Sequence, residues 1–425
     1  MRIRKSLTAA TLCLAACALV FEGGLNAQGS RAAAMGGAYV GLVDDFSAFY
    51  WNPAGLARIT GKTFGFYGAD ILPTGSYKYS RTYPAPIGTV TLADAKTLTK
   101  NYIGGLAGYV QPLTENLVVG LGIYTPPGLG AAWDGEALAA LSGGATDLDW
   151  KSRMGLITFA PTIAYRLNDI LSFGASLNIN VGTFALSSYT GAYGDLIDLS
   201  QYTESETGLG LGATLGLQFQ PHRMVRLGLV YRTASKVGLS GTAEISRLTY
   251  LGLASQSDVD RTITWPASLA GGLAFMPTGR LTISADVQYT NWGRIQSLDA
   301  DYADSAWSQI MAATGRDTIP MRWRDTVQVR LGGEYKVSSA LAVRAGWHND
   351  PSPAPDETMN LLLPTFDFNA LTLGLGYRVA DLSLDFGLEY LMGAERTISA
   401  DSADAVPGVY NMKILVPTMS VHYKF

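Results

Sequence analysis

Residues 30–59 read SRAAAMGGAYVGLVDDFSAFYWNPAGLARI, and this stretch is the most informative part of the chain. It is too apolar for a linker, alternates poorly as a strand, and contains too much Gly and Pro for one long helix. The glycine pair 36–37 provides a flexible turn, the acidic pair 44–45 can cap a short helix over 46–50, and the NPAG sequence at 52–55 can end that helix with a turn. The stretch predicts a small folded plug.

The overall composition is unusual for a soluble protein. Of 425 residues, 48% are hydrophobic and only 16% are charged, whereas a soluble chain carries charge on about a quarter of its residues. No apolar run after residue 27 approaches the roughly 20 residues of a spanning helix. A closed β-barrel is then the structure that satisfies the backbone polar groups in lipid.

The first 27 residues have the organisation of a secretory signal: a basic start, an apolar middle and a short polar-to-small end. We predict that residues 1–27 are removed after Ala27. An alternative is lipidation at Cys17, because the preceding Leu-Ala-Ala resembles a lipoprotein box. Both cysteines, Cys13 and Cys17, lie in this segment, so no disulfide is expected in the rest of the chain.

After the plug, apolar residues alternate with polar or small ones, as expected for strands with one face to lipid and one to a lumen. The alternation is clear over 281–289, 371–378 and 382–390. Such segments predict roughly fourteen antiparallel strands over residues 61–425, with one segment too many, so 240–248 is either a loop or an extension of its neighbour. Glycine is frequent on the lumen face, which leaves room for something inside.

The connections between the predicted strands have two lengths. Tight turns such as 168–169 are expected on the periplasmic side, and long connections such as 126–150 and 293–322 on the outside. Two long loops contain short helical patterns, 136–141 and 306–311. Their apolar faces either pack on each other or form a greasy groove at the mouth of the barrel.

Several residues mark the edges of the predicted barrel. The chain ends on Phe425 after an alternating segment, which resembles the end signal of outer-membrane barrels.

Pro161, Pro266 and Pro417 lie within predicted strands and lack an N–H for the ladder, so each is a candidate break in the wall. Aromatic belts at the two membrane interfaces explain the tryptophans near strand ends, which are Trp265, Trp292, Trp323 and Trp347.

The parity of the strands places seven charged residues on the lumen face. They either pair with one another and hold the plug, or supply an Arg that meets a carboxylate ligand. The set comprises Asp286, Arg330, Glu334, Arg344, Arg378, Asp385 and Glu389.

The sequence offers no sign of catalysis. It has three histidines and neither an H-E-x-x-H nor a G-x-S-x-G motif. We therefore predict no enzyme activity, no catalytic or metal-binding residues and no cofactor. The net charge of −4 and the absence of a basic cluster also argue against nucleic acid as a partner.

GGAYVGLVDDFSAFYWNPAGLA, at 36–57, resembles the N-terminal hatch of the FadL family of outer-membrane transporters, and residues 263–292 and 323–379 are similar to later strands of that family. The resemblance implies a signal at 1–27, a hatch at 28–60 and a transmembrane barrel at 61–425, in the bacterial outer membrane. It also implies passive diffusion of long-chain fatty acids or aromatic hydrocarbons, gated by the hatch. The expected gating residues form the hatch turn: Asn52, Pro53, Ala54 and Gly55.

We expect the ligand to meet the hatch and one extracellular loop. In the hatch, the candidates are either plug core or ligand wall: Phe46, Phe49 and Tyr50. In the loop, the predicted groove residues are Trp133, Leu138 and Leu141. The expected partners are outer-membrane lipid and a long-chain fatty acid or another hydrophobic small molecule, and the protein is expected to act as a monomer. An alternative is a FadL-like partner of a secretion system that binds exported proteins.

Overall fold

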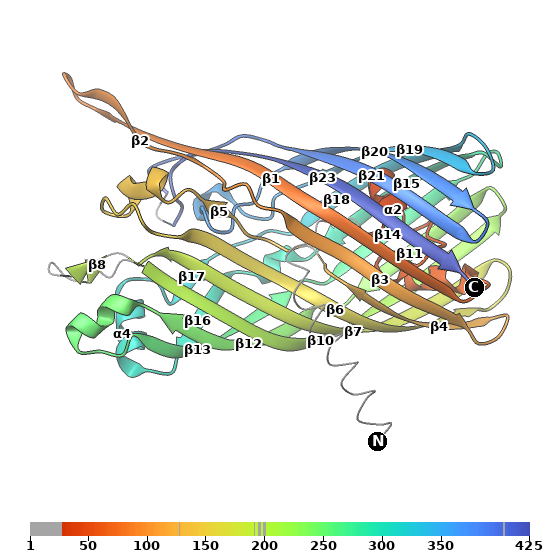
Figure 1. The fold of residues 1–425 in the computed structure, drawn as a ribbon, viewed down its shortest axis with the longest axis horizontal. Helices are drawn as coiled ribbons and strands as arrows, with labels where there is room; N and C mark the ends of the chain where they lie inside the picture. The colour runs from red at the N-terminus through yellow and green to blue at the C-terminus, as the bar shows by residue number, and fades with distance from the viewer. Residues whose placement is uncertain (1–27, 127, 191, 194–196, 199–200, 403) are drawn as a thin grey trace.

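The computed structural model describes residues 28–126, 128–190, 192–193, 197–198, 201–402 and 404–425. They form a closed antiparallel barrel with fourteen wall strands, as the sequence predicted (Figure 1). Strand β1 pairs with β23 as well as with β3, which closes the barrel. In order around the wall, the strands are β1 (Thr63–Tyr83), β3 (Tyr102–Pro112), β4 (Leu117–Tyr124), β6 (Trp150–Arg166), β7 (Leu171–Tyr189), β10 (Gln201–His222), β11 (Val225–Arg232) continued by β12 (Ser235–Glu244), β13 (Gln256–Trp265) continued by β14 (Ser268–Phe275), β15 (Leu281–Thr290), β18 (Thr326–Lys336), β19 (Leu341–Asp350), β20 (Phe368–Val379), β21 (Leu382–Gly393) and β23 (Gly408–Lys424).

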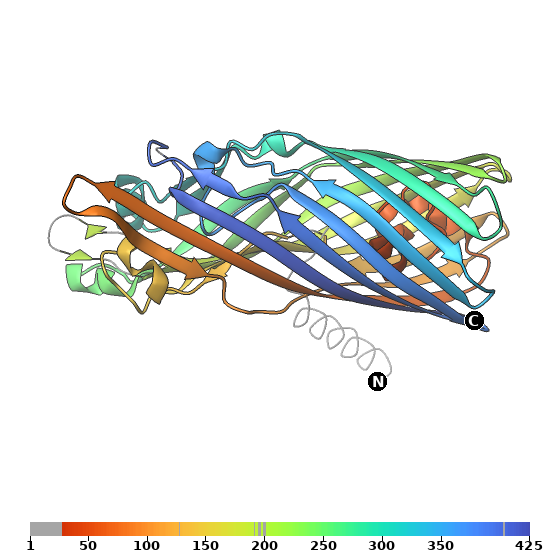
Figure 2. The same cartoon turned by 90° about the horizontal axis from the view of Figure 1, so that it is seen from above.

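The two ends of the barrel differ. Short turns and the C-terminus lie at one end, which we call the turn end, and the long connections lie at the other, the loop end (Figures 1 and 2). No helix among the described residues is long and apolar enough to cross a bilayer. The predicted signal segment, with cleavage at Ala27 or lipidation at Cys17, lies outside the described residues. The elements of the connections are β2 (Gly88–Lys96), β5 (Ala132–Trp133), η2 (Glu136–Leu141), β8 (Ala192–Tyr193), β9 (Ile197–Asp198), η3 (Ser246–Leu251), η4 (Trp292–Arg294), β16 (Ser297–Tyr302), α4 (Ser305–Ala313), β17 (Thr318–Pro320), η5 (Asp356–Thr358) and β22 (Arg396–Ile398).

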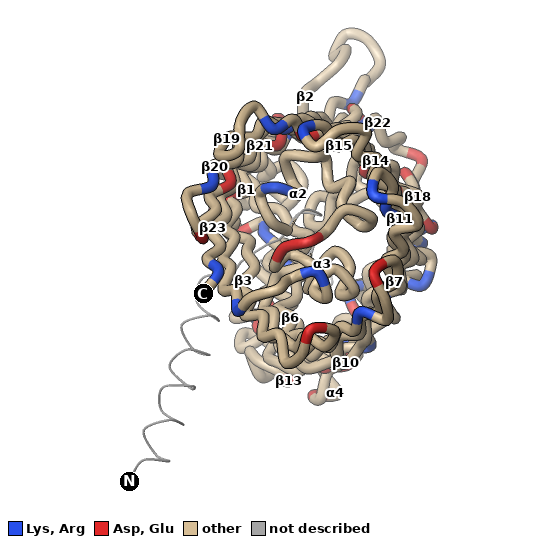
Figure 3. The backbone as a smooth tube through the Cα atoms, turned by 90° about the vertical axis from the view of Figure 1, so that its right-hand side faces the viewer, with Lys and Arg blue, Asp and Glu red and all other residues tan. Residues whose placement is uncertain are grey.

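The strand pattern was predicted well in the part of the barrel that faces lipid, and less well in the strand extensions at the loop end. Leu371, Leu373 and Leu375 are exposed on the outer face, while Thr372 between them is buried. Residues 240–244 of the ambiguous segment extend the neighbouring strand, because β12 continues the wall strand that β11 begins, whereas residues 246–248 belong to η3. The hairpin of β1 and β2 projects outward from the wall at the loop end and was not predicted, since both of its faces meet water at the tip and no alternation is required there (Figures 1 and 3).

Proline interrupts the wall at each of the three predicted places. Pro266 separates β13 from β14, and the neighbouring wall strand is interrupted at the same level, between Arg232 and Ser235. Pro161 and Pro417 each keep a partner in one neighbouring strand and fall in a gap of the pairing with the other. The interruption at Pro266 is therefore the widest of the three, since it affects two adjacent strands.

The plug lies inside the barrel near the turn end and consists of three short helices: α2 (Ser30–Ala34), α3 (Ala48–Trp51) and η1 (Pro53–Arg58). The view along the barrel shows α2 and α3 within the ring of strands (Figure 3). The expected helix over 46–50 begins two residues later, because the Asp45 carboxylate accepts hydrogen bonds from the backbone N–H and hydroxyl of Ser47. The NPAG sequence does end α3, and it also starts η1.

Glycines of the wall provide the space that the hatch occupies. A Cβ atom at Gly216 would lie 2.1 Å from Asn52 Oδ1, and one at Gly174 would lie 2.3 Å from the backbone nitrogen of Ala54. A Cβ at Gly228 would likewise lie 2.2 Å from the carbonyl oxygen of Val40. These lumen-face glycines are therefore seats for the hatch, which is why small lumen-facing residues alternate along the strands with apolar lipid-facing ones.

Candidate ligand cavity and hatch seat

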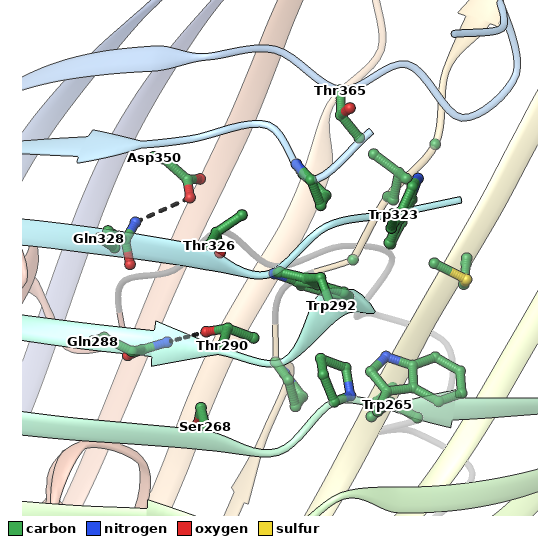
Figure 4. A pocket seen from close by; sticks show the side chains of 18 of the residues that line it. Trp265, Ser268, Gln288, Thr290, Trp292, Trp323, Thr326, Gln328, Asp350 and Thr365 are labelled. Atoms are coloured by element: carbon green, nitrogen blue, oxygen red, sulfur yellow. Dashed lines mark hydrogen bonds between the residues drawn. The ribbon is translucent and has the colours of Figure 1, made fainter. Parts of the chain in front are cut away.

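A cavity of about 300 Å³ lies on the loop-end side of the hatch. Tyr50 is the hatch residue that borders it, and the rest of its lining comes from wall strands, from residues that link their ends, and from two long connections, one containing Gly128 and Leu129 and the other Pro351 and Phe366. Ligand cavities in proteins are mostly apolar, with a few polar groups that fix orientation. The arrangement of polar and aromatic residues around this cavity follows that rule (Figure 4).

The strand register arranges the lining in tiers. Arg232, Ser268, Thr290 and Thr326 are successive cross-strand partners on β11, β14, β15 and β18, so their side chains form one row on the lumen face. Gln288 and Gln328 are partners two residues nearer the turn end. Tryptophans lie beyond the row, toward the loop end, in all three strand continuations, and they are Trp265, Trp292 and Trp323.

The glutamine tier is held in one orientation by Arg330, which lies one step nearer the turn end and is 1% exposed. The Arg330 guanidinium donates to Oε1 of Gln288, at 3.1 Å, and to Oε1 of Gln328. The amide nitrogens then donate away from Arg330: Gln288 to the Thr290 hydroxyl at 3.2 Å and Gln328 to the Asp350 carboxylate at 3.0 Å (Figure 4). The amide N–H donors therefore face the cavity.

The tryptophan tier provides apolar surface at the outer part of the cavity. The rings of Trp292 and Trp323 meet edge to face, with centroids 5.2 Å apart. Trp265 is 9% and Trp323 is 3% exposed, so these rings do not belong to a lipid-facing belt as the sequence analysis interpreted them. The apolar chain of an amphipathic ligand would contact this tier, and its polar head would be directed to the row formed by Arg232, Ser268, Thr290 and Thr326.

Arg232 connects the cavity to the hatch. Its Nη2 donates to the backbone carbonyl of Tyr50 at 2.8 Å, and its guanidinium lies 4.7 Å from the centroid of the Tyr50 ring. A second, much smaller space of about 10 Å³ lies between the hatch and the wall, and both Arg232 and Tyr50 border it.

The first half of the hatch is fixed by buried charges. Arg31 donates to Glu334 at 2.8 Å and to Asp44 at 2.8 Å, and Glu334 also accepts from Arg344 at 2.7 Å. Burial disfavours the charged Asp44 carboxyl, but Arg31 and Arg226 outweigh this effect, so the pKa of Asp44 is lowered from its ordinary value. The prediction that lumen charges pair and hold the plug is correct for Glu334, which pairs with Arg31 of the hatch and with Arg344, and pairing within the set also holds for Arg344 and Asp385.

The other charged residues predicted on the lumen face differ in their contacts. Asp286 accepts from the backbone N–H groups of Tyr39 at 2.6 Å and Val40 at 2.7 Å, and Asp385 accepts from Arg344 at 2.7 Å. Glu389 lies 3.6 Å from a ring nitrogen of His348. Arg378 is different: it has the predicted parity but lies near the turn end, where its side chain is exposed.

The second half of the hatch is held mainly by neutral groups. The Asn52 amide donates to the carbonyl oxygens of Val40 and Leu217, both at 3.1 Å, and its side-chain oxygen accepts from the N–H of Ala54. Asn52 is fully buried, so these bonds satisfy a side chain that has no access to water. Pro53, Ala54 and Gly55 are also buried.

The family profile described as outer membrane protein transport protein (OMPP1/FadL/TodX) matches residues 7–425. The chain belongs to this family. Members of the FadL family are transporters of the bacterial outer membrane, and the barrel with its internal hatch is their fold. The chain is accordingly a transport protein rather than an enzyme.

Two curated relatives extend over most of the chain. Outer membrane protein P1 of Haemophilus influenzae is 23% identical over 425 residues, which cover 89% of each chain. A long-chain fatty acid transport protein of Escherichia coli is 24% identical over 403 residues, with 84% of each chain covered.

Two solved structures share the fold. A FadL homologue of Pseudomonas aeruginosa superposes with a TM-score of 0.76 at 19% identity, over 95% of this chain and all of the other. The toluene transporter TodX of Pseudomonas putida gives a TM-score of 0.73 at 20% identity, over 96% of this chain and all of the other.

The residues predicted to bind ligand in this FadL-family protein lie in three places. Tyr50 borders the cavity. Phe46 and Phe49 are packed against the wall, where Cβ atoms at Gly65 and Gly122 would lie 2.1 Å and 2.5 Å from their rings, so both belong to the plug core in this structure. Their role in ligand contact stays a prediction.

The predicted loop residues lie in a separate cluster at the loop end. Trp133 is buried and donates its indole N–H to the carbonyl of Leu361 at 2.6 Å, and Leu138 and Leu141 pack in the same cluster. The helical segment 306–311 belongs to another cluster, as α4, so the two segments do not pack on each other. A groove beside Trp133 stays a prediction.

Sequence reasoning missed Arg232 and the glutamine tier. Gln288 was recognised only as the polar side of an alternating strand, and Arg232 lies at a strand end where a charged residue needs no special explanation. The cross-strand register that aligns them requires the pairing of strands far apart in sequence. Among the described residues, no group of three or more His, Cys, Asp or Glu is arranged to hold a metal ion.

Proposed function

We propose that the protein carries long-chain fatty acids, and related hydrophobic molecules, across the outer membrane by passive diffusion, with the hatch as its gate. The observation that supports this most strongly is the cavity between the tryptophan tier and the hatch. Molecules of this class partition poorly into water, so they require an apolar site rather than an open aqueous pore. The names of the relatives, a long-chain fatty acid transport protein and a toluene transporter, give two substrate classes to test.

The alternative function, a partner of a secretion system, makes a different demand on the interior. A scaffold that binds exported proteins can be filled solid, whereas a transporter needs space beside its hatch. The cavity of about 300 Å³ next to Tyr50 therefore favours transport. We propose further that the protein works as a monomer surrounded by outer-membrane lipid.

The first experiment is ligand binding to the purified protein in detergent. Labelled oleate and labelled toluene are titrated separately into the wild type and into Asn52→Ala, which removes the side-chain bonds to Val40 and Leu217. Saturable binding of oleate, with faster uptake in proteoliposomes by Asn52→Ala, is the expected result, because the hatch turn is then less firmly held. If neither ligand binds saturably, the transport proposal is wrong and co-purifying proteins become the target.

The exit from the cavity is proposed at the wall interruption beside Pro266. Thr233, Ser235 and Pro266 border both the interruption and the cavity. Replacing Pro266 by Val restores an N–H for the ladder and should lower uptake without reducing barrel assembly. Pro417→Val is the matched control, since Pro417 does not border the cavity; equal uptake by wild type and Pro266→Val would reject this exit.

A further inference from the structure

Asn178 has an unpaired side-chain oxygen beside the cavity. The residue lies on β7, is 3% exposed and borders the cavity. Its amide nitrogen donates to the Thr214 hydroxyl at 2.8 Å, but its side-chain oxygen has no hydrogen-bond partner among the described residues. Buried polar groups are nearly always hydrogen-bonded, because an unpaired one costs free energy. An unpaired acceptor at the edge of a ligand cavity is therefore a candidate ligand contact.

A second asparagine on the same strand does not share this property. Asn180 lies two residues further along β7 and also borders the cavity. Its side-chain oxygen accepts from the Thr158 hydroxyl at 2.7 Å, and its amide nitrogen donates to the Ser235 hydroxyl at 2.8 Å. Both ends of the Asn180 amide are thus paired within the wall, whereas Asn178 is paired only through its nitrogen.

The residue beside Asn178 leaves its amide uncovered. The cross-strand partner of Asn178 on β10 is Gly212, which also borders the cavity. A Cβ atom at Gly212 would lie 3.9 Å from the Asn178 Cβ, so a larger side chain there would lie next to the amide. With glycine at this position, a ligand in the cavity can approach the Asn178 oxygen.

Arg232 supplies hydrogen-bond donors close to this acceptor. Its Nε donates to the same Thr214 hydroxyl, at 3.5 Å, so Asn178 and Arg232 meet at one oxygen atom. A guanidinium has five N–H groups, and the bonds to Thr214 and to the Tyr50 carbonyl use two of them. One small region of the wall therefore offers both N–H donors and an unpaired acceptor. The polar group that satisfies both must accept one hydrogen bond and donate another.

We propose that Asn178 and Arg232 form a hydroxyl subsite, and that the cavity therefore takes long-chain alcohols. The inference rests on the proposed function, which brings a hydrophobic molecule to this cavity. The alcohol oxygen accepts from Arg232, and its hydrogen is donated to the Asn178 oxygen. A carboxylate only accepts hydrogen bonds, so it can meet Arg232 but leaves the Asn178 oxygen unpaired. A hydrocarbon satisfies neither group.

The surroundings of the subsite suit the apolar chain of such a molecule. Met154 and Leu156 border the cavity from β6, and the tryptophan tier borders it toward the loop end. The bond from Asn178 to Thr214 joins two wall strands and does not involve the hatch. A hydroxyl bound at Asn178 therefore acts on ligand selection, and the hatch keeps its contacts.

The test compares three ligands that share a dodecyl chain: dodecanol, dodecyl methyl ether and dodecanoate. Each is titrated into the purified wild type in detergent at about pH 8, where the carboxylate is ionised. The ether keeps the acceptor oxygen of dodecanol but lacks the hydrogen that Asn178 accepts. Dodecanol should bind about tenfold more tightly than the ether, as expected when a buried acceptor is left unpaired. Equal affinities for these two ligands would show that the subsite is wrong, whatever the variants do.

Two matched variants assign the effect to Asn178. Asn178→Leu removes the acceptor at similar volume, and its affinity for dodecanol should fall about tenfold, to that for the ether, while its affinity for dodecanoate stays near the wild-type value. Asn180→Leu makes the same change where the oxygen is already paired, and it should keep the preference for dodecanol. Heat-modifiable migration on gels checks that each variant retains its barrel. An unchanged preference in Asn178→Leu, or an equal loss in both variants, would contradict the assignment.

The remaining outcomes distinguish the subsite from the transport function. If dodecanoate binds saturably but the wild type does not distinguish dodecanol from the ether, the subsite is wrong and the transport proposal stands. If none of the three ligands binds the wild type saturably, the transport proposal is wrong and the subsite is rejected with it.

Discussion

The first half of the hatch, residues 30–45, meets the barrel through buried ion pairs, whereas the second half, residues 47–58, meets it through backbone groups, wall glycines, Asn52 and a bond from Arg58 to a neutral glutamine. Glu334 binds two guanidinium groups below the first half. The second half has Asn52, the bond from Arg232, and the bond that Arg58 donates to Gln218 at 2.8 Å, and none of these is a buried ion pair. Breaking a buried ion pair costs more than losing a neutral hydrogen bond, so the two halves should open with different free energies.

Because their contacts with the barrel differ, the two halves of the hatch are suited to different roles. The charged half anchors the plug to β18 through Glu334, and none of residues 30–45 borders the main cavity. The neutral half borders the cavity at Tyr50 and can respond to a ligand at modest cost. Functional segments of proteins are commonly the parts that open with low free energy, and the second half has that property here.

The largest effect should come from Glu334→Gln. The change leaves Arg31 and Arg344 with less compensating charge in a buried site, and we expect the first half of the hatch to lose about 3 kcal/mol of stability. Hydrogen exchange of amides 33–43 measures this loss. The control is Asp149→Asn, which breaks an exposed pair with Lys151 and should change protection by less than about 0.5 kcal/mol. Unchanged protection in Glu334→Gln would mean that the charges do not anchor this half.

A smaller effect, in the other half, is expected for Gly216→Ala. The new Cβ would lie 2.1 Å from Asn52 Oδ1 and 2.8 Å from Pro53, so the hatch turn must shift, at about 2 kcal/mol for overpacking. Exchange over 52–57 should rise while that over 33–43 stays constant. Gly155→Ala is the matched control, since its Cβ would have no atom within 4 Å. Equal changes in both halves would show that the hatch opens as one unit.

The smallest effect concerns pH and Asp44. Because the pKa of Asp44 is lowered in the folded protein, its contribution is fully present above the ordinary value of 3.8 and is lost as the pH falls through the lowered pKa. We expect a contribution under about 1 kcal/mol, because the carboxylate is partly exposed. Exchange of the first half, corrected for intrinsic rates, is compared between wild type and Asp44→Asn. The difference should be constant from pH 7 to pH 5 and should shrink as the pH falls below the ordinary value of 3.8; a difference that disappears by pH 5 would contradict the ion pair.

The sequence by itself determined the barrel and the plug. Period-two alternation, the shortage of charge and the absence of a spanning helix leave few solutions in a membrane, and the Gly- and Pro-rich stretch at 30–59 cannot be a wall strand. These signals are local, so they can be read along the chain. The positions of breaks in the wall were also local, because a missing N–H at Pro266 acts on its own strand.

Only the tertiary structure decided which residues meet around the cavity. Arg232, Ser268, Thr290 and Thr326 come from four strands, and a shift of one residue in any register would turn a side chain out toward lipid. Packing likewise placed Phe49 against wall glycines and left Tyr50, its neighbour, beside the cavity. The physical reason is that alternation fixes the face on which a residue lies, but cross-strand pairing fixes its height and its neighbours.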